Sequence, residues 1–240
     1  MDDAITAQPK AVAPTKARPD ASTDQPTRFR ISRHIVCLAE PDHPRAEAIR
    51  ALRAHLLAGH LAHGRRSLAV CAATPGVGST YLSVNLAVAF AQAGINTLLV
   101  DANLHDGAGV ESLIQPEEDV PGLRQVLQQN DPSMMNAIQN DVLPNLSVLY
   151  SGGSGPNAQE LLASKQFKLL IDDCMRDHEI TIVDTPAGKG SSDVRRIAKS
   201  VRYALVVARR NQTMLSDLRT LVDELDSDRV NLIGSFLTDF

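Results

Sequence analysis

The stretch that decides the fold is AATPGVGSTY, residues 72–81. It follows an apolar run over residues 67–73 and precedes a helical pattern over residues 80–93. Gly76 and Gly78 allow the backbone to turn tightly, so that successive N–H groups can point toward one anion. The positive N-terminal end of the following helix favours an anion at the same place. The stretch therefore predicts a glycine-rich loop between a strand and a helix that is suited to holding phosphate.

The loop departs from the usual phosphate-binding loop, or P-loop, at one position. That pattern places a lysine directly before a serine or threonine, whereas here Ser79 stands before Thr80. A dinucleotide-binding fingerprint fits less well, because its third glycine would fall at Tyr81. On this motif alone, a tight turn without a ligand stays the alternative. The P-loop interpretation predicts a nucleotide-binding set that comprises Gly76, Val77, Gly78, Ser79 and Thr80.

Composition restricts the class of protein. The chain has 240 residues, of which 43% are hydrophobic and 22% charged, close to the average of globular domains. The formal net charge of -4 argues against an extended electrostatic contact with nucleic acid, so we expect no nucleic-acid partner. No apolar run reaches the roughly 18 residues needed to cross a bilayer, and the N-terminus lacks a secretory pattern. With three cysteines that form no CxxC pair, these features predict a cytoplasmic protein.

The chain divides into a tail and one domain. Residues 1–30 contain four prolines and few large apolar side chains, which predicts a disordered Pro/Ala-rich tail. Residues 31–240 alternate apolar runs with helical patterns, which predicts a single α/β domain with a mostly parallel sheet and helices on both faces. The predicted strands lie at 67–73, 96–101, 146–150, 179–184, 203–208 and 231–237. The predicted helices lie at 45–61, 80–93, 120–129, 132–139, 157–177, 192–200 and 213–225. Asn157 and Glu160 are the expected capping pair of the helix over 157–177.

Two carboxylates end predicted strands. Asp101 closes the run over 96–101, and Asp184 closes the run over 179–184. In open α/β sheets, ligands bind at the carboxyl edge of the strands. Together with Thr80, the two carboxylates are candidate ligands for Mg²⁺ and the candidate catalytic acids. The alternative for each aspartate taken singly is a helix cap.

At this point the chain resembles the bacterial tyrosine kinases (BY-kinases) of the P-loop MinD/ParA-like superfamily. Five segments carry the resemblance. They are PGVGSTYLSVNLA at 75–87 (Walker A), VDANLH at 100–105 (Walker A′), IVDTP at 182–186 (Walker B), the E-x-x-R-x-x-R pattern of Glu47, Arg50 and Arg53, and GGSGPNAQELL at 152–162.

The resemblance implies a P-loop NTPase-like fold, ATP and Mg²⁺ as cofactors, and a role in exopolysaccharide biosynthesis and export. It also implies a homo-oligomer packed through Glu47, Arg50 and Arg53, for which a solvated helix face is the alternative. The implied partner is a membrane chain-length determinant (Wzz/Wzc-like) protein. The chain would then be cytoplasmic and would lie at the inner face of the membrane only through its contact with that partner.

The departures from the family pattern concern chemistry. Ser79 replaces the Walker A lysine, Asn103 the second Walker A′ aspartate and His105 the arginine after it. Thr238 stands where related ATPases have the asparagine that reads adenine, and we find no C-terminal tyrosine cluster. In a preorganised catalytic site, one lost donor costs roughly 10²–10³ in rate. Lys189 is the candidate substitute cation.

We therefore expect a BY-kinase-like pseudo-kinase, in which ATP and Mg²⁺ binding is weakened or lost, acting as a regulatory or structural partner. One alternative is an active tyrosine autokinase of the same pathway that compensates for Ser79. Another is a MinD/ParA-type ATPase, which would use a further lysine near the start of the loop, where this chain has Thr74.

Overall fold

The computed structural model describes residues 28–105, 109–129, 137–188 and 192–239. Within these residues one large sheet organises the domain. Its strands are β2 (Ser67–Ala72), β3 (Thr97–Asp101), β5 (Gln139–Leu143), β6 (Leu146–Leu149), β7 (Ile180–Asp184), β8 (Tyr203–Arg209) and β9 (Asn231–Thr238). The order across the sheet is β5-β6-β3-β7-β2-β8-β9. Only the β5–β6 pair among these neighbours is antiparallel, so the expected mostly parallel sheet is confirmed.

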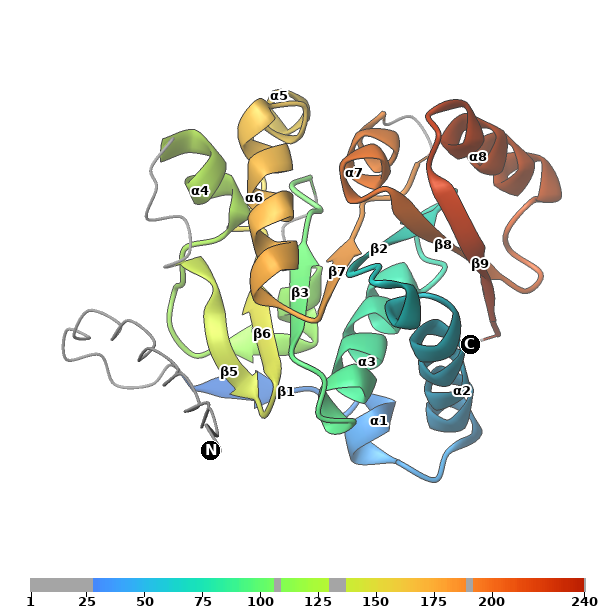
Figure 1. Ribbon diagram of the computed structural model, residues 1–240. Coiled ribbons are helices and arrows are strands. Elements are labelled where there is room, and N and C mark those ends of the chain that lie inside the picture. The colour runs from blue at the N-terminus through green and yellow to red at the C-terminus, as the bar shows by residue number, and fades with distance from the viewer. Residues whose placement is uncertain (1–27, 106–108, 130–136, 189–191, 240) are drawn as a thin grey trace, which may run out of the picture.

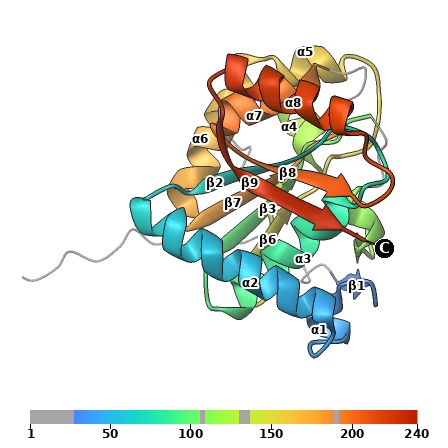
Figure 2. The same cartoon turned by 90° about the vertical axis from the view of Figure 1, so that its right-hand side faces the viewer.

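Helices cover both faces of the sheet, as Figures 1 and 2 show. One face carries α1 (Val36–Ala39), α2 (Pro44–Gly59) and α3 (Ser79–Gln92). The other carries α4 (Leu123–Gln129), α5 (Ala158–Leu162), α6 (Lys165–Asp177), α7 (Asp193–Val201) and α8 (Leu215–Ser227). Single turns of 3-10 helix lie at Leu61–His63 and Val110–Ser112.

The alternation of strand side chains divides the core between these two faces. In β2, Leu68 and Val70 pack in the cluster under α1–α3, whereas Ala69 and Cys71 pack in the cluster under α4–α8. Helix α3 is buried over ten consecutive residues, Leu82–Ala91, because it lies between the sheet and α2 (Figure 2). A helix enclosed on both sides holds its N-terminus, and therefore the glycine-rich loop, rigidly against the sheet edge.

Several sequence-based expectations need correction. The helix predicted over 157–177 is two helices, because Ser164 caps α6 by accepting a hydrogen bond from the amide of Phe167 at 3.2 Å. Asn157 adopts a φ of +67° and makes no side-chain capping bond, so the predicted capping pair with Glu160 is wrong. Most of the helix predicted over 132–139 lies outside the described residues, and its last residue begins β5 instead.

A second, two-stranded sheet was also unforeseen. Strand β1 (Phe29–Ile31) pairs antiparallel with β4 (Ile114–Pro116), and its first two residues lie within the range predicted for the tail. Residues 1–27 lie outside the described residues, and the tail stays a prediction. Among the helices that the structure describes, none combines the length and apolar character required to span a bilayer.

Candidate nucleotide site

The glycine-rich loop connects the end of β2 to the start of α3 at the carboxyl edge of the sheet. Gly76 has a φ of +75° and Gly78 a φ of +90°, a region in which a residue with a Cβ is strained. Gly78 directly precedes Ser79, the first residue of α3. The first amides of a helix have no partner within the helix, and the helix dipole makes this end positive. The loop therefore has the two left-handed glycines and the adjoining helix start on which the predicted anion site depends.

Side chains from the end of β8 and from the loop after it hold the glycine-rich loop from one side. The Arg209 Nη1 atom donates a hydrogen bond to the Gly76 carbonyl at 3.0 Å, and Gln212 Nε2 donates to the Pro75 carbonyl at 3.5 Å. These contacts restrain the loop without using its N–H groups. Nothing local in the sequence indicates which loop Arg209 meets.

Thr238 holds the same loop from β9. Its hydroxyl is buried and lies 2.7 Å from the Val77 carbonyl and 3.2 Å from the Ala208 carbonyl. The Thr238 hydroxyl therefore bonds to the backbone of the protein itself. At the position where related ATPases read adenine, this chain therefore has a structural contact in place of an amide side chain.

Asp184 is the best-connected acid of the site. One carboxylate oxygen accepts a hydrogen bond from Thr80 Oγ1 at 2.6 Å, and the other accepts one from Ser83 Oγ at 2.8 Å. The predicted grouping of Thr80 with Asp184 is thus present in space. Ser83 was not predicted, although it lies one helical turn after Thr80 and helical periodicity would have found it.

Asp101 lies beside Asp184 because β3 and β7 are neighbours in which these two residues are directly paired. The Asp101 carboxylate accepts hydrogen bonds from the amides of Asn103 at 3.0 Å and Val110 at 2.9 Å. It therefore shapes the chain that follows β3. The sequence predicts both acids at one edge of the sheet. The structure shows in addition that they lie side by side on adjacent strands.

Burial dominates the electrostatics of this pair. It raises the pKa of Asp101 to about 6, and burial together with the charge of Asp101 raises the pKa of Asp184 to about 7. Two buried carboxylates side by side disfavour simultaneous ionisation, and a divalent cation would offset this repulsion. With Thr80 they form a set of hard oxygen donors of the kind that Mg²⁺ prefers. The residues present fit a magnesium ion.

The loop also fits a phosphate group, with one contact missing. Thr74 Oγ1 is buried and has no hydrogen-bond partner among the described residues, so a bound group would complete its bonding. Ser79, at the lysine position, contributes a carbonyl that accepts a bond from Ser83 Oγ at 3.0 Å and carries no charge. The candidate substitute Lys189 lies outside the described residues.

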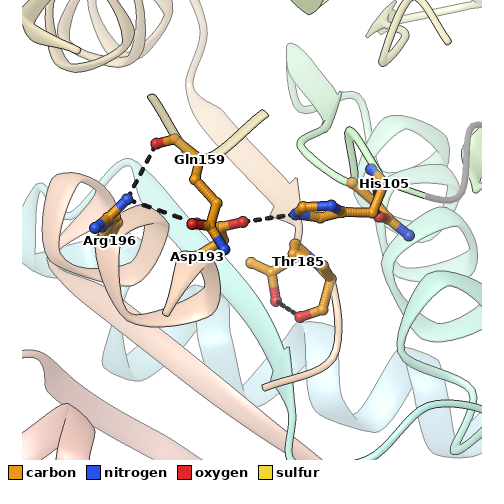
Figure 3. A network of polar contacts seen from close by, with 7 residues as sticks. His105, Gln159, Thr185, Asp193 and Arg196 are labelled. Atoms are coloured by element: carbon orange, nitrogen blue, oxygen red, sulfur yellow. Dashed lines mark hydrogen bonds and ion pairs between the residues drawn. The ribbon is translucent and has the colours of Figure 1, made fainter. Parts of the chain in front are cut away.

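His105, at the arginine position after Walker A′, is tied to α7 (Figure 3). Its Nε2 atom lies 2.6 Å from Oδ2 of Asp193, whose carboxylate is completely buried. Arg196 Nη1 lies 3.9 Å from the other oxygen of Asp193 and donates to the Gln159 carbonyl at 3.1 Å. The contact fastens the segment after β3 to the helix layer. Asp193 carries no motif by which the sequence would have revealed it.

The predicted interface residues lie on α2. Arg50 Nη2 is 2.7 Å from Glu47 Oε2, and the Glu47 side chain is 70% exposed. Arg53 Nη1 donates to the Ala89 carbonyl of α3 at 2.8 Å. Arg53 therefore contributes to the packing of α2 on α3, whereas Glu47 and Arg50 form an exposed pair.

Comparison with known proteins agrees with this geometry. The sequence profile of the AAA domain family matches residues 65–228. The chain is 28% identical to tyrosine-protein kinase YwqD of Bacillus subtilis, over 87% of this chain and 86% of that protein. It is also 28% identical to EpsB of Ralstonia solanacearum over 90% of this chain, but spans only 28% of EpsB.

Solved structures extend the agreement to three dimensions. The kinase domain of the Escherichia coli tyrosine kinase ETK superposes with a TM-score of 0.77 at 27% identity, over 85% of this chain and 79% of that one. The matched profile spans more than half of the chain and contains the glycine-rich loop, Asp101 and Asp184. The chain therefore belongs to the bacterial tyrosine kinase family, within the P-loop MinD/ParA-like superfamily of AAA-type domains.

Proposed function

We propose that this protein is a BY-kinase-like pseudo-kinase that acts as a regulatory or structural component of exopolysaccharide chain-length control and export, of capsule or holdfast type. The observation that carries the proposal is the neutral Ser79 at the first position of α3, where the family pattern has lysine. A loop that keeps its shape and loses its cation retains part of phosphate binding and little of phosphoryl transfer.

The charge balance supports weakened catalysis. Phosphoryl transfer relies almost entirely on positioning and on stabilising charge on the transferred group. Mg²⁺, when bound, supplies positive charge to phosphate oxygens, and Thr80, Asp101 and Asp184 are the residues that would hold it. The loop amides position the phosphates, and the buried surroundings of Asp184 exclude water from the metal ligands. Asn103 is neutral and cannot accept a proton as a carboxylate would.

Calorimetry with Mg²⁺ and ATP tests this proposal. We expect weak binding by the wild type and roughly tenfold to 100-fold tighter binding by Ser79→Lys, because a hydrogen bond to a charged group contributes about 1.5–3 kcal/mol. Ser227→Lys is the matched control, since it adds the same charge at an exposed position at the far end of α8. Micromolar binding by the wild type together with phosphotyrosine formation would contradict the pseudo-kinase assignment.

An active autokinase is the second candidate, and one contact favours it. The Arg209 guanidinium already lies at the glycine-rich loop, 3.0 Å from the Gly76 carbonyl, and is a cation that can supply charge near bound phosphate. If Arg209 compensates for Ser79, wild-type protein incubated with Mg²⁺ and ATP forms phosphotyrosine and Arg209→Gln does not. Absence of phosphotyrosine in both proteins excludes this candidate.

The proposed cellular setting follows the family. The partner would be a membrane chain-length determinant of Wzz/Wzc type, through which the chain associates with the cytoplasmic face of the membrane. Normal surface polysaccharide after deletion of the gene would contradict this assignment. We also propose a homo-oligomer that packs through α2, with Glu47 as the contact residue that is most accessible.

Light scattering tests the proposed oligomer. Glu47→Lys reverses an exposed charge without disturbing the contact of Arg53 with α3, and it should lower the mean mass in solution. Glu118→Lys is the matched control on an exposed residue outside α2. A wild type that is monomeric, or a mass that Glu47→Lys leaves unchanged, argues against the interface.

A further inference from the structure

A basic groove separates α6 from α7 on the outer side of the helix layer. Its volume is about 630 Å³, within the range of sites that hold drug-sized ligands. The residues that line it are Leu162, Ala163, Ser164, Lys165, Lys168, Arg196, Lys199, Ser200 and Arg202. Five of these nine are cationic and none is acidic, in a chain whose net charge is -4. The groove therefore concentrates positive charge on a protein that is acidic as a whole.

Three of the cationic side chains of the groove form no ion pair among the described residues. Within the part of the chain that the structure describes, Lys165, Lys168 and Lys199 make no ion pair or hydrogen bond with another side chain, and all three are exposed. By contrast, Arg202 Nη2 lies 3.2 Å from Asp172 Oδ1, and Arg196 contacts the Gln159 carbonyl. The groove thus contains positive charge that the fold does not use.

The cations form two rows. Lys165 and Lys168 lie three residues apart on α6, and Arg196 and Lys199 lie three residues apart on α7, so that each pair projects from one side of its helix. The two helices run beside each other on the face of the sheet opposite α2 (Figures 1 and 2). A ligand that meets all four residues must extend along the groove and carry several negative charges.

This arrangement does not suit a single phosphate group. Phosphate sites bring donors together on one point, often with the free amides of a helix N-terminus. At the start of α6 the Phe167 amide is already bonded to Ser164 Oγ at 3.2 Å. The walls of the groove also include Ala163, which is exposed and would contact an apolar side chain of a peptide.

We propose that the groove between α6 and α7 binds an acidic peptide segment of a partner protein, with carboxylates along both rows of cations and a small apolar side chain against Ala163. None of the residues that line the groove belongs to the glycine-rich loop. A protein that carries it can dock a partner whether or not it transfers phosphate.

Fluorescence anisotropy of the full-length protein tests the proposal. The probe is a fluorescein-labelled peptide of alternating glutamate and leucine, compared with its glutamine–leucine twin. We expect the glutamate peptide alone to bind, and more weakly as salt is raised from about 0.05 to about 0.5 M, because salt screens exposed charges. The triple variant Lys165→Gln, Lys168→Gln, Lys199→Gln should bind roughly tenfold more weakly, since each exposed pair contributes modestly.

A second triple variant controls for general charge. Arg33→Gln, Arg66→Gln and Arg219→Gln remove the same charge from exposed positions outside the groove and should leave peptide binding within about twofold. Equal weakening by both triple variants overturns the proposal, as does equal binding of the two peptides. Displacement of the peptide by inorganic pyrophosphate or by phosphatidylglycerol vesicles at lower concentrations than by unlabelled peptide assigns the groove to phosphate groups and also overturns it. Thermal melting of each variant verifies that the fold is intact.

Discussion

Replacing Asp184 with asparagine should stabilise the metal-free protein near pH 8. The Asp184 carboxylate is completely buried and is paired across adjacent strands with buried Asp101. Burial and this neighbouring charge raise the pKa of Asp184 from its ordinary value of 3.8 to about 7. At about 1.4 kcal/mol for each pKa unit, ionisation of this group lowers the free energy of unfolding by roughly 4 kcal/mol. Asparagine removes that penalty.

The gain is reduced by a donor that the carboxylate does not have. The bonds from Thr80 and Ser83 to the carboxylate lower its pKa and are therefore already included in the roughly 4 kcal/mol. In the variant, Thr80 Oγ1 can donate to the asparagine oxygen, and Ser83 Oγ can accept one N–H of the asparagine while it donates to the Ser79 carbonyl, from which it lies 3.0 Å. Burying the second N–H of the asparagine without a partner costs about 2 kcal/mol. The net stabilisation near pH 8 is therefore about 2 kcal/mol.

The stabilisation by asparagine should depend on pH. Because the folded-state pKa of Asp184 lies above its unfolded value, the destabilisation is absent below about pH 4, grows as pH rises, and is complete above about pH 7. The wild type thus loses stability across this interval, whereas the variant does not. Near pH 4.5 folded wild type holds Asp184 protonated, so the stabilisation by asparagine should have disappeared and the cost of the extra buried N–H remains.

Thermal unfolding followed by circular dichroism in EDTA measures the difference. Near pH 8 the midpoint should rise by about 4–8 °C, since 1 kcal/mol shifts the midpoint of a domain of this size by about 2–4 °C. Asp223→Asn, at an exposed position on α8, is the control and should change the midpoint little. A variant that is less stable than the wild type near pH 8, or equally stabilised near pH 4.5, refutes the reasoning.

Three further changes test other parts of the structure. Gly78→Ala places a Cβ on a residue with a φ of +90° and should lower the free energy of unfolding by about 1–2 kcal/mol in urea titration. Phe167→Ala empties a fully buried position under the sheet and should lower it by about 3–5 kcal/mol in the same assay; a loss below 1 kcal/mol would show that the site collapses. A double-mutant cycle of His105→Ala with Asp193→Asn should give a coupling energy of about 1 kcal/mol, because the 2.6 Å contact joins a fully buried acid to a partly exposed ring. Additive effects in that cycle would mean that the contact contributes nothing.

Much of the fold could be predicted from local patterns. The apolar runs that became β2, β3 and β7 have few polar residues because parallel strands in this sheet are buried on both faces. The glycine-rich loop was predictable because a positive φ at Gly76 and Gly78 excludes most other residues. The motif order then placed Asp101 and Asp184 at the correct edge of the sheet.

Other features depend on contacts between distant segments. Strands β1 and β4 are three residues long and are strands only because they pair with each other, so no local periodicity marks them. The edge strand β5 is half-exposed and includes Asp141 at a φ of +54°, which weakens any alternation. The contact of Arg209 with the loop requires knowledge that β8 lies beside β2. The tie of His105 to Asp193 likewise depends on where α7 packs.

The residue at position 79 and the two acids differ in how much they contribute to the fold. This difference explains how the chain can lack the loop lysine and keep the fold. A lysine at position 79 would extend toward ligand, and Ser79 at the first turn of α3 is compatible with the helix without it. The acids are different, because Asp101 orders the amides of Asn103 and Val110 and Asp184 bonds Thr80 and Ser83. Truncating either acid would leave buried donors without partners, at a cost of about 1–3 kcal/mol each. Loss of the lysine therefore removes chemistry at little structural cost, whereas loss of the acids removes both. A loop that retains its acids, glycines and supporting contacts while Ser79 is neutral is what this asymmetry predicts for the pseudo-kinase that we propose.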